Sequence, residues 1–344
     1  MSNQDTCGIE VSAKQLVVRL RRYEELEPGR SFANTPEGHA LIVRYLQRAG
    51  RVVRVCLEST GLYGLDLALA LHAAEGLEVM VANPRAVRNF AKALMQRSKN
   101  DPLDAAVLEE FAARMPFQSW QPPSSPVLAL HALTRRLRDL VEMLAAEKNR
   151  QHAAGLSQTI PAAVRRDLAR SVRAQERAIQ RLTRQTRRLI AQDPQLVERF
   201  QLLDSVPGIG ETSALQLLGE LAVLSPDLGA RQWVAYAGLD PRAYDSGSSV
   251  HKKPRISKAG NKHLRHSLYM PALVGVQHDP HLRAFYQHLQ GLGKVKMQAL
   301  VAVMRKLLHA IHAMFRTHQP YDGSKLFRPT LTPVQEVTSA PVTA

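Results

Sequence analysis

Two spacings of apolar residues divide the chain near residue 120. Before that point, short runs rich in β-branched residues alternate with segments whose apolar residues recur at helical spacing. This alternation is typical of an α/β domain in which helices cover a mixed sheet. The predicted strands are 6–11, 15–20, 51–57 and 78–82, and the predicted helices are 62–75, 84–97 and 101–114.

A cluster of helix-breaking residues at 120–126, Trp-Gln-Pro-Pro-Ser-Ser-Pro, predicts a linker and a domain boundary. Leucines then recur at helical spacing up to an interruption at 155–161, and a second apolar stripe continues to Leu189. These stripes predict two long amphipathic helices that pair as an antiparallel coiled coil.

From about residue 194 the pattern indicates a second globular unit that is mostly helical, with a loop at 240–260 and a last long helix at about 295–315. The final stretch is rich in Pro and Thr, which favours disorder. The predicted organisation is an α/β domain at 1–122, linker and basic coiled-coil helices at 123–193, a mainly α domain at 194–322 and a disordered tail at 323–344.

The net charge of the chain indicates the kind of partner that it binds. The chain has 46 Lys and Arg against 30 Asp and Glu, a formal net charge of +16, which favours a polyanionic partner. No apolar run reaches the roughly 18 to 20 residues that cross a bilayer, so we expect nucleic acid rather than membrane, and a cytoplasmic protein. Cys7 and Cys56 lie in apolar runs and are expected to be buried, reduced thiols.

The two long helices carry an excess of Arg and Lys. A charged helix face is often only a solvated surface, but with this overall charge it is also a candidate for contact with a nucleic-acid backbone. The pattern leaves both interpretations open.

Four carboxylates of the first domain form the first candidate site. Glu10 and Glu58 end predicted strands, while Asp101 and Asp104 lie three residues apart at a helix start and share a face. Mg²⁺ takes oxygen ligands, and two such ions can stabilise the attacking and leaving oxygens of phosphoryl transfer. Alternatively, Asp101 caps a helix that begins at Pro102, Asp104 favours its dipole, and Glu58 is a solvated strand end. We favour the metal site because the four acids occur together.

A glycine turn is the second candidate. In Ser-Val-Pro-Gly-Ile-Gly-Glu at 205–211, Gly208 and Gly210 expose backbone N–H groups before a helix, as in helix-hairpin-helix motifs that hold a phosphate. A plain turn between helices explains the same residues equally well.

The third candidate is the loop Tyr-Asp-Ser-Gly-Ser-Ser at 244–249. A hydroxyl there could attack a phosphodiester while nearby cations stabilise the charged transition state. Ser-Gly-Ser-Ser is also ordinary loop composition. The cations proposed to bind nucleic acid are Lys252, Lys253, Arg255, Lys258 and Lys262.

Several motifs, in order along the chain, resemble those of one enzyme family. In the first half these are Gly-Ile-Glu-Val-Ser at 8–12, Leu-Glu-Ser-Thr-Gly at 57–61, Asn-Pro at 83–84 and Asn-Asp-Pro-Leu-Asp at 100–104. In the second half they are Val-Pro-Gly-Ile-Gly at 206–210, Tyr-Ala-Gly-Leu at 236–239, the serine loop, Ser-Lys-Ala-Gly-Asn at 257–261 and Tyr-Met-Pro-Ala at 269–272. Together they resemble the DEDD transposases of the IS110 family of insertion sequences, whose first half has a RuvC-like, RNase H fold.

The resemblance implies a bacterial, nucleoid-associated recombinase guided by a structured bridge RNA that pairs with donor and target DNA. It implies that Glu10, Glu58, Asp101 and Asp104 hold Mg²⁺. It also implies that Ser246 forms a covalent phosphoserine link to DNA. In such proteins the acids of one subunit and the serine of another meet in a composite site, so a homo-oligomer, from dimer to tetramer, is expected.

One position departs from the family pattern, which has Asp where this chain has Glu10. Glu keeps the charge but adds a methylene, which shifts the carboxylate in a site where Mg²⁺ tolerates little change. Two alternatives therefore stay open: a RuvC-like junction nuclease that activates water, and a nucleic-acid-binding protein with an impaired metal site.

Overall fold

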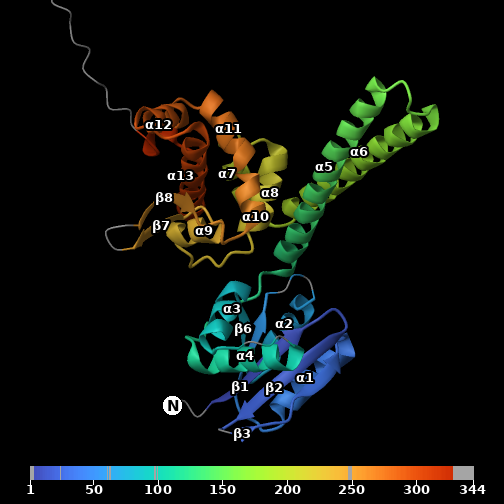
Figure 1. Cartoon of the computed structure of the whole chain (residues 1–344), viewed down its shortest axis with the longest axis vertical. Coiled ribbons are helices and arrows are strands. Elements are labelled where there is room, and N and C mark those ends of the chain that lie inside the picture. Colours follow the sequence, from blue (N-terminus) through green and yellow to red (C-terminus); the bar gives the residue numbers. More distant parts are fainter. Residues whose placement is uncertain are drawn as a thin grey trace, which may run out of the picture. The chain divides into compact units, whose positions relative to one another are not determined.

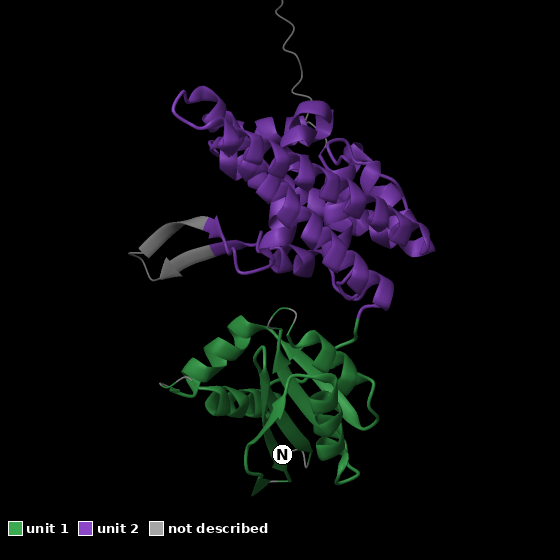
Figure 2. Cartoon of the chain, turned by 90° about the vertical axis from the view of Figure 1, so that its right-hand side faces the viewer, with its two compact units in different colours: residues 1–122 green, residues 123–344 purple. Residues whose placement is uncertain are grey.

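The computed structural model describes residues 4–23, 25–59, 61, 63–96, 98, 100–246 and 250–327, and for 243–246 and 250–254 it describes the strands alone. The chain divides into two compact units, unit 1 at 1–122 and unit 2 at 123–344 (Figure 2). The division falls within the breaker cluster. The long helices at 125–191 belong to the same unit as the helices that follow, whereas the sequence assigned them to a separate segment.

Unit 1 is a mixed sheet in the strand order β3-β2-β1-β5-β6, with β4 also paired with β2 (Figure 1). The central strand β1 is antiparallel to β2 and parallel to β5, and β5 is parallel to β6. This arrangement is consistent with an RNase H-like fold. The strands are β1 (Asp5–Val11), β2 (Gln15–Arg22), β3 (Glu25–Leu26), β4 (Arg30–Ala33), β5 (Val53–Glu58) and β6 (Leu77–Ala82).

Two pairs of helices cover the two faces of this sheet (Figure 1). Odd-numbered residues of β1 pack with α1 and α2, while Cys56 of β5 faces the other side and packs with α3 and α4. The helices are α1 (Pro36–Gln47), α2 (Leu65–His72), α3 (Pro84–Ala93) and α4 (Asp101–Arg114).

The predicted strands and helices of unit 1 are confirmed apart from their ends, but the sequence analysis missed β3, β4 and α1. The signal for α1 was present, because Thr35 caps the helix by accepting a hydrogen bond from the Gly38 amide and Pro36 occupies the first turn. Trp120, placed in the linker, belongs to unit 1: its amide donates to Val79 O at 2.6 Å.

Unit 2 is mainly helical. Its two longest helices, α5 (Ser125–Leu156) and α6 (Ala162–Ala191), lie side by side and extend away from the other helices of the unit (Figure 1). The other elements are α7 (Pro194–Asp204), α8 (Glu211–Leu221), α9 (Ala230–Tyr236), β7 (Pro241–Ser246), β8 (Val250–Ile256), α10 (Lys262–Ser267), α11 (Tyr269–His278), α12 (Pro280–Gly291), α13 (Lys296–Thr317) and η1 (Gly323–Lys325).

The described part of 240–260 is not the predicted loop. Strand β7 pairs with β8 as an antiparallel hairpin, with a register irregularity between Arg242 and Tyr244. The segment was predicted to be a loop because it is rich in Gly, Ser, Lys and Arg. A two-stranded ribbon does not need a continuous apolar face, so this composition does not exclude paired strands. The tail beyond residue 327 lies outside the described residues, while the 3-10 turn η1 occupies the start of the segment predicted to be disordered.

Both cysteines are buried free thiols, as predicted. In the described part of the chain, no helix is both long and apolar enough to cross a membrane.

Candidate functional site

Strand register brings Glu10 and Glu58 to one face of the sheet. Strands β1 and β5 are parallel, with Gly8 beside Cys56 and Ile9 beside Leu57. Because side chains alternate along a strand, Glu58 shares the face of Cys56, and Glu10 shares the face of Gly8. Both acids therefore lie at the carboxyl end of the strand pair, on the side covered by α3 and α4.

Gly8 allows α4 to lie directly against β1. A Cβ built on Gly8 would overlap the Ala105 carbonyl oxygen and the Glu109 amide nitrogen. The helix can therefore approach the strand only where the residue has no side chain. This close approach sets Asp104, next to Ala105, beside the end of β1.

The side chain of Glu109 also fixes α4 on the sheet. This side chain is 1% exposed and accepts a hydrogen bond from Thr6 Oγ1 at 2.5 Å. Arg21 of β2 donates to both carboxylate oxygens of Glu109, at 2.7 and 2.9 Å. A buried carboxylate with this many donors holds the helix in one register. The sequence analysis did not identify Gly8, Arg21 or Glu109 as positioning residues.

Three of the four predicted metal ligands line one cavity of about 1000 Å³, which we call the acidic cavity. They are Glu10, Glu58 and Asp104. Helix α3 contributes three cations to the same lining: Arg85, Arg88 and Lys92. The cavity thus has carboxylates that could hold a hard cation and basic groups that could hold a phosphate.

Cys56 lies under this site but cannot serve as its nucleophile. Burial and the nearby charge of Glu58 raise the pKa of the Cys56 thiol to about 12. A thiol with such a pKa stays protonated near neutral pH, and only the thiolate is strongly nucleophilic.

Asp101, the fourth predicted ligand, is the first residue of α4 and is exposed, and it is not among the described residues that line the acidic cavity. The alternative that it caps the helix is wrong. Asn100 is the cap, because its side chain accepts a hydrogen bond from the Leu103 amide at 3.0 Å. Glu10, Glu58 and Asp104 line the same cavity, but among the described residues no three His, Cys, Asp or Glu side chains lie close enough together in this structure to form a group that could hold a metal ion.

The hairpin carries the predicted nucleophile and three of the predicted cations. Ser246 is the last residue of β7, and Lys252, Lys253 and Arg255 lie in β8. For Ser246, Lys252 and Lys253 the described structure extends only to the strands. The remaining positions of the predicted serine loop, 247–249, fall outside the described residues. Arg255, Lys258 and Lys262 are exposed at the foot of the hairpin.

One side-chain hydrogen bond and a close packing of two glycines hold the foot of the hairpin. Ser257 Oγ donates to Asp240 Oδ1 at 2.5 Å, which ties the two ends of the hairpin together. Gly238, with φ of +64°, packs against the backbone of Gly260, and neither position has room for a Cβ. These contacts explain the glycines of two of the family motifs.

A buried polar network anchors the same region to α5 and α8. Glu220 accepts hydrogen bonds from Arg135 Nε at 3.0 Å and from Asn261 Nδ2 at 2.6 Å. Asn261 also caps α10 and donates to the Tyr236 hydroxyl at 3.1 Å. Burial would raise the pKa of Glu220, but His131, Arg135 and Asn261 outweigh it and lower the pKa to about 2. The sequence analysis missed Glu220 and Arg135, because nothing local in the chain indicates their pairing.

The glycine turn at 205–211 has two different glycines. Gly208, with φ of +96°, lies against the backbone of Pro271 and Gly275 in α11, so packing alone explains its identity. Gly210 precedes α8 with open space around its Cα. Both line a cavity of about 620 Å³, which leaves phosphate contact by this turn as a prediction.

Helix α6 presents a stripe of exposed arginines. At about 100° per residue they fall within an arc of about 80°, over about 33 Å of helix. The side opposite carries the buried residues Val172, Thr186 and Ile190. Arg170 pairs with Asp167 at 3.7 Å, and the other six have no carboxylate within ion-pair distance among the described residues. The stripe consists of Arg166, Arg170, Arg173, Arg177, Arg181, Arg184 and Arg188.

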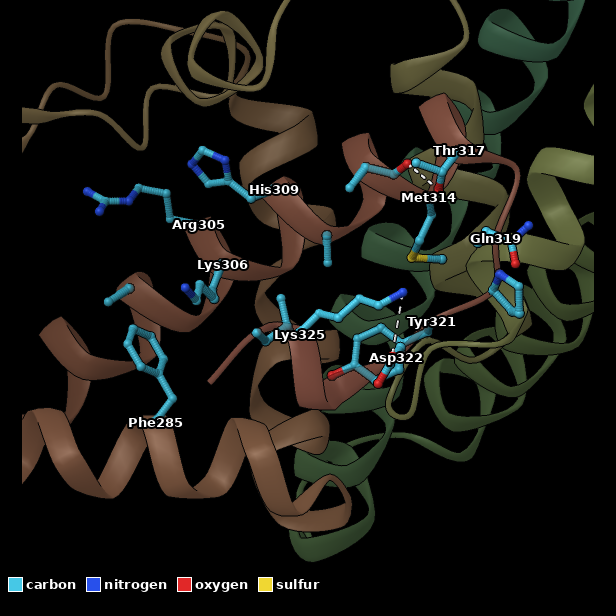
Figure 3. Close-up of a pocket in the computed structure, with 15 residues that line it drawn as sticks. Phe285, Arg305, Lys306, His309, Met314, Thr317, Gln319, Tyr321, Asp322 and Lys325 are labelled. Carbon is cyan, nitrogen blue, oxygen red and sulfur yellow. Dashed lines mark hydrogen bonds and ion pairs between the residues drawn. The ribbon is translucent and has the colours of Figure 1, made fainter. Parts of the chain in front are cut away.

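A separate cavity of about 560 Å³ lies between α13 and the segment after it (Figure 3). Arg305, Lys306 and His309 of α13 line it, together with Tyr321 and the ion pair between Lys325 and Asp322. None of the predicted site residues is among its described lining residues.

Comparison with known proteins matches both units. Residues 7–161 match the DEDD transposase model of the IS110 type, and residues 200–287 match the transposase IS116/IS110/IS902 family. A pilin gene-inverting protein of Moraxella bovis is 31% identical over 299 residues, covering 85% of this chain and 90% of that protein. The transposase for insertion sequence element IS1328 of Yersinia enterocolitica is 29% identical over 226 residues, covering 59% of this chain and 65% of that protein.

The RNase H-like sheet with acids at its strand ends and the helical unit after it agree with the matched transposase models, and these matches identify the chain as a DNA transposase, which is a phosphoryl-transfer enzyme. The chain belongs to the IS110 family of transposases. Its DEDD domain implies a divalent-metal site, and the carboxylates of the acidic cavity are suitable ligands for one.

Proposed function

We propose that this protein exchanges DNA strands through a covalent phosphoserine intermediate on Ser246, guided by a structured RNA that pairs with donor and target DNA. The observation that carries the proposal is the convergence of Glu10, Glu58 and Asp104 on one cavity. Family membership supports recombination chemistry in general. The serine, the RNA and the ligand set are the parts that require a test.

Glu10, Glu58, Asp101 and Asp104 would hold Mg²⁺ at the acidic cavity. When bound, Mg²⁺ would neutralise charge that develops on the oxygens of the phosphate under attack. The arginines and lysine of α3, which line the same cavity, would bind the same phosphate. Asp101, at the exposed start of α4 and three residues before Asp104, would complete the set.

The serine step conserves the number of bonds. Ser246 Oγ would lose its proton and form an ester with phosphorus, while the bond from phosphorus to the leaving sugar oxygen breaks and that oxygen takes up a proton. A hydroxyl at a new strand end then attacks the ester and releases Ser246. No energy cofactor is required, because the ester retains the phosphoryl bond.

The arginine stripe of α6 and the cations after Ser246 would contact the nucleic-acid backbone without reading sequence, since phosphate contacts position a protein but do not specify a site. Specificity would then come from base pairing of the RNA, as in other guided effectors. We propose a dimer or tetramer in which the acids and the serine that act together come from different subunits. Its place of action would be the bacterial nucleoid.

The relative from Moraxella bovis is named for inverting a pilin gene. Inversion and transposition use the same strand exchange and differ in the arrangement of the DNA sites. The same assay therefore tests both possibilities for this chain.

The test is a denaturing-gel assay for a protein–DNA adduct with the purified full chain, flanking RNA, donor and target DNA, and Mg²⁺. We expect a protease-sensitive adduct that is lost in Ser246→Ala and in Glu58→Gln. Matched controls are Ser119→Ala and Glu75→Gln, which change an exposed serine and an exposed carboxylate of unit 1 outside the acidic cavity.

Each alternative predicts a distinct outcome. Cleavage that survives in Ser246→Ala would establish a metal-dependent nuclease instead of a serine recombinase. RNA or DNA binding without any Mg²⁺-dependent product would indicate the impaired binding protein. An adduct that forms equally well when the RNA is omitted would contradict guidance while leaving the serine step intact.

A further inference from the structure

A cavity of about 490 Å³ in unit 2, which we call the basic cavity, is lined mainly by α5, α10, α13 and the turn after β8. Its apolar lining comes mainly from Leu239, Ile256, Val301 and Met304. Its charged lining has more cations than anions: Arg138, Lys258, Lys262 and Arg265 against Asp139 and Glu142. Two imidazoles, those of His263 and His266, complete it.

Arg138 has donor capacity that the protein does not use. Its side chain is 11% exposed, and its Nε donates to Glu142 Oε1 at 3.0 Å, one turn further along α5. Its Nη1 is buried and has no hydrogen-bond partner among the described residues. A buried guanidinium nitrogen without an acceptor costs free energy, so an acceptor from outside the chain would be favourable here.

His263 has a second unused group in the same cavity. Its Nδ1 is buried and also lacks a partner among the described residues. Burial, together with the charges of Arg135 and Arg138, lowers the pKa of its imidazole. A bound anion would oppose both effects and would accept a hydrogen bond from the ring.

The cavity lies next to the hairpin that carries the predicted nucleic-acid-binding cations, which suggests a nucleic-acid backbone as the source of such an anion. Lys258 follows β8 closely and has a left-handed backbone with φ of +51°, a conformation that is unfavourable for a non-glycine residue. Its amide donates to Gly238 O at 3.1 Å, which keeps the turn against α9. Lys258 and Lys262 line the cavity and are exposed to solvent.

We infer that the basic cavity binds a phosphate group, with Arg138 Nη1 and His263 Nδ1 as its buried donors and Lys258 and Lys262 as its outer charges. The inference rests on the proposed function only in naming a nucleic-acid backbone as the source of the phosphate. A metal ion is disfavoured, because four cations line the cavity against only two carboxylates among the described lining residues. Arg138 and His263 thereby become binding residues. They lie 125 positions apart, and nothing in the sequence indicates that either one lies near the serine hairpin.

The first test measures thermal unfolding of the full chain in inorganic phosphate and in chloride at matched ionic strength. A ligand that binds only the folded state raises the melting temperature. We expect the extra rise in phosphate to be at least halved in Arg138→Gln and in His263→Gln. Arg136→Gln and His278→Gln are matched controls, because both side chains are exposed and neither is a described lining residue.

Comparing the phosphate increment of each variant with its own chloride value separates binding from any loss of stability. Arg138→Lys provides a second check, since it keeps the charge but loses the two-nitrogen fork and should give an intermediate increment. An increment that is the same in all the variants would mean a general effect of phosphate on the protein and would overturn the site.

The second test assigns the source of the phosphate. The salt dependence of affinity is measured for a DNA duplex and for an RNA hairpin, where each lost phosphate contact lowers the slope of log K against log salt by about 0.9 on B-DNA. A slope reduced by about one in Arg138→Gln identifies DNA, RNA or both as the ligand. Unchanged slopes with both, beside a lost phosphate increment, would restrict the cavity to free phosphate and overturn the backbone assignment.

The adduct assay keeps the two proposals apart. If Arg138→Gln binds phosphate normally while the wild-type chain forms the Ser246 adduct, the cavity is wrongly assigned and the proposed function stands. If phosphate binds as expected and no adduct forms, the cavity is correct and the serine chemistry is not.

Discussion

The acidic cavity of unit 1 and the basic cavity of unit 2 are assembled by different kinds of contact. Two acids of the first lie at the ends of neighbouring parallel strands, and the third lies on the helix packed against one of them. The second joins Arg138 of α5 to residues of α10 and to the turn after β8. A sheet edge gathers side chains by its register alone, whereas a cavity between helices depends on tertiary packing.

The two regions also offer different points at which a substitution should act. In unit 1 the close approach of α4 to Gly8 should make the site sensitive to added volume. In unit 2 the buried carboxylate of Glu220 should make the foot of the hairpin sensitive to charge and to pH.

The largest expected effect is on unit 2. Glu220→Ala removes the acceptor for Arg135 and Asn261 and should lower the free energy of unfolding by about 3 kcal/mol or more. Urea denaturation of the full chain measures it. Glu198→Ala, which removes a half-exposed carboxylate paired with His318, should cost well under about 1 kcal/mol. Similar losses in both variants would contradict a special role for Glu220.

The pH dependence of the same network follows from its pKa. Folding lowers the pKa of Glu220 from 4.5 to about 2, which corresponds to about 3 kcal/mol. Because the folded-state pKa is the lower one, this stabilisation is complete above about pH 4.5 and is lost as pH falls towards 2. The stability difference between wild type and Glu220→Gln should therefore shrink as pH falls from about 4.5 towards 2. A constant difference would refute it.

The next effect belongs to unit 1. Gly8→Ala should destabilise the chain by about 1 to 3 kcal/mol, because Cβ meets the backbone of α4 and not a flexible side chain. It should also reduce adduct formation by moving Asp104. Gly29→Ala is the matched control, since its added Cβ would meet only an ordinary contact at 3.9 Å. Full activity in Gly8→Ala would show that helix spacing does not set the site.

A smaller effect is expected on binding alone. Replacing Arg173, Arg177, Arg181 and Arg184 of the α6 stripe by Gln should lower the salt slope of DNA or RNA affinity by up to about 3 to 4, with no large change in stability. The same four positions changed to Lys keep the charge and should keep the slope. If the Gln variant binds with an unchanged slope, the stripe is only a solvated surface.

The smallest effect concerns Glu10. Glu10→Asp restores the family's residue and should lower the Mg²⁺ concentration for half-maximal adduct formation a few-fold, because the shorter side chain changes the ligand position. Glu10→Gln should abolish the product and serves as the control for charge. A higher Mg²⁺ requirement in Glu10→Asp would mean that α4 and β1 are spaced for the longer side chain.

These contrasts also explain what the sequence could predict. The strands around Glu10 and Glu58 carried a clear apolar pattern, so their place at one sheet edge was predictable. The place of Asp104 near these acids could be predicted from the helix that starts at Asp101. The role of Gly8 could not, because a glycine within a strand indicates only a weaker strand and not a helix packed against it. Arg138 and His263 gave no signal, since their partnership exists only after α5 packs on α8 and Asn261 caps α10.

For the hairpin, the sequence carried a clear signal that predicted the wrong structure. Its Gly, Ser, Lys and Arg residues predicted a loop, and the paired strands β7 and β8 were missed. Composition reports how much apolar surface a segment can bury, and a two-stranded ribbon held at its foot by Asp240 and Ser257 needs little.

The tight packing at Gly8 also determines how easily a mutation could inactivate a copy of the gene. Every missense change at the Gly8 codon adds at least a Cβ, so none of the alternatives leaves α4 where it is. One base change could thus disable a copy of the gene while Glu10, Glu58, Asp101 and Asp104 all remain in its sequence. A survey that scores copies as intact by their acidic residues alone would count such a copy as working.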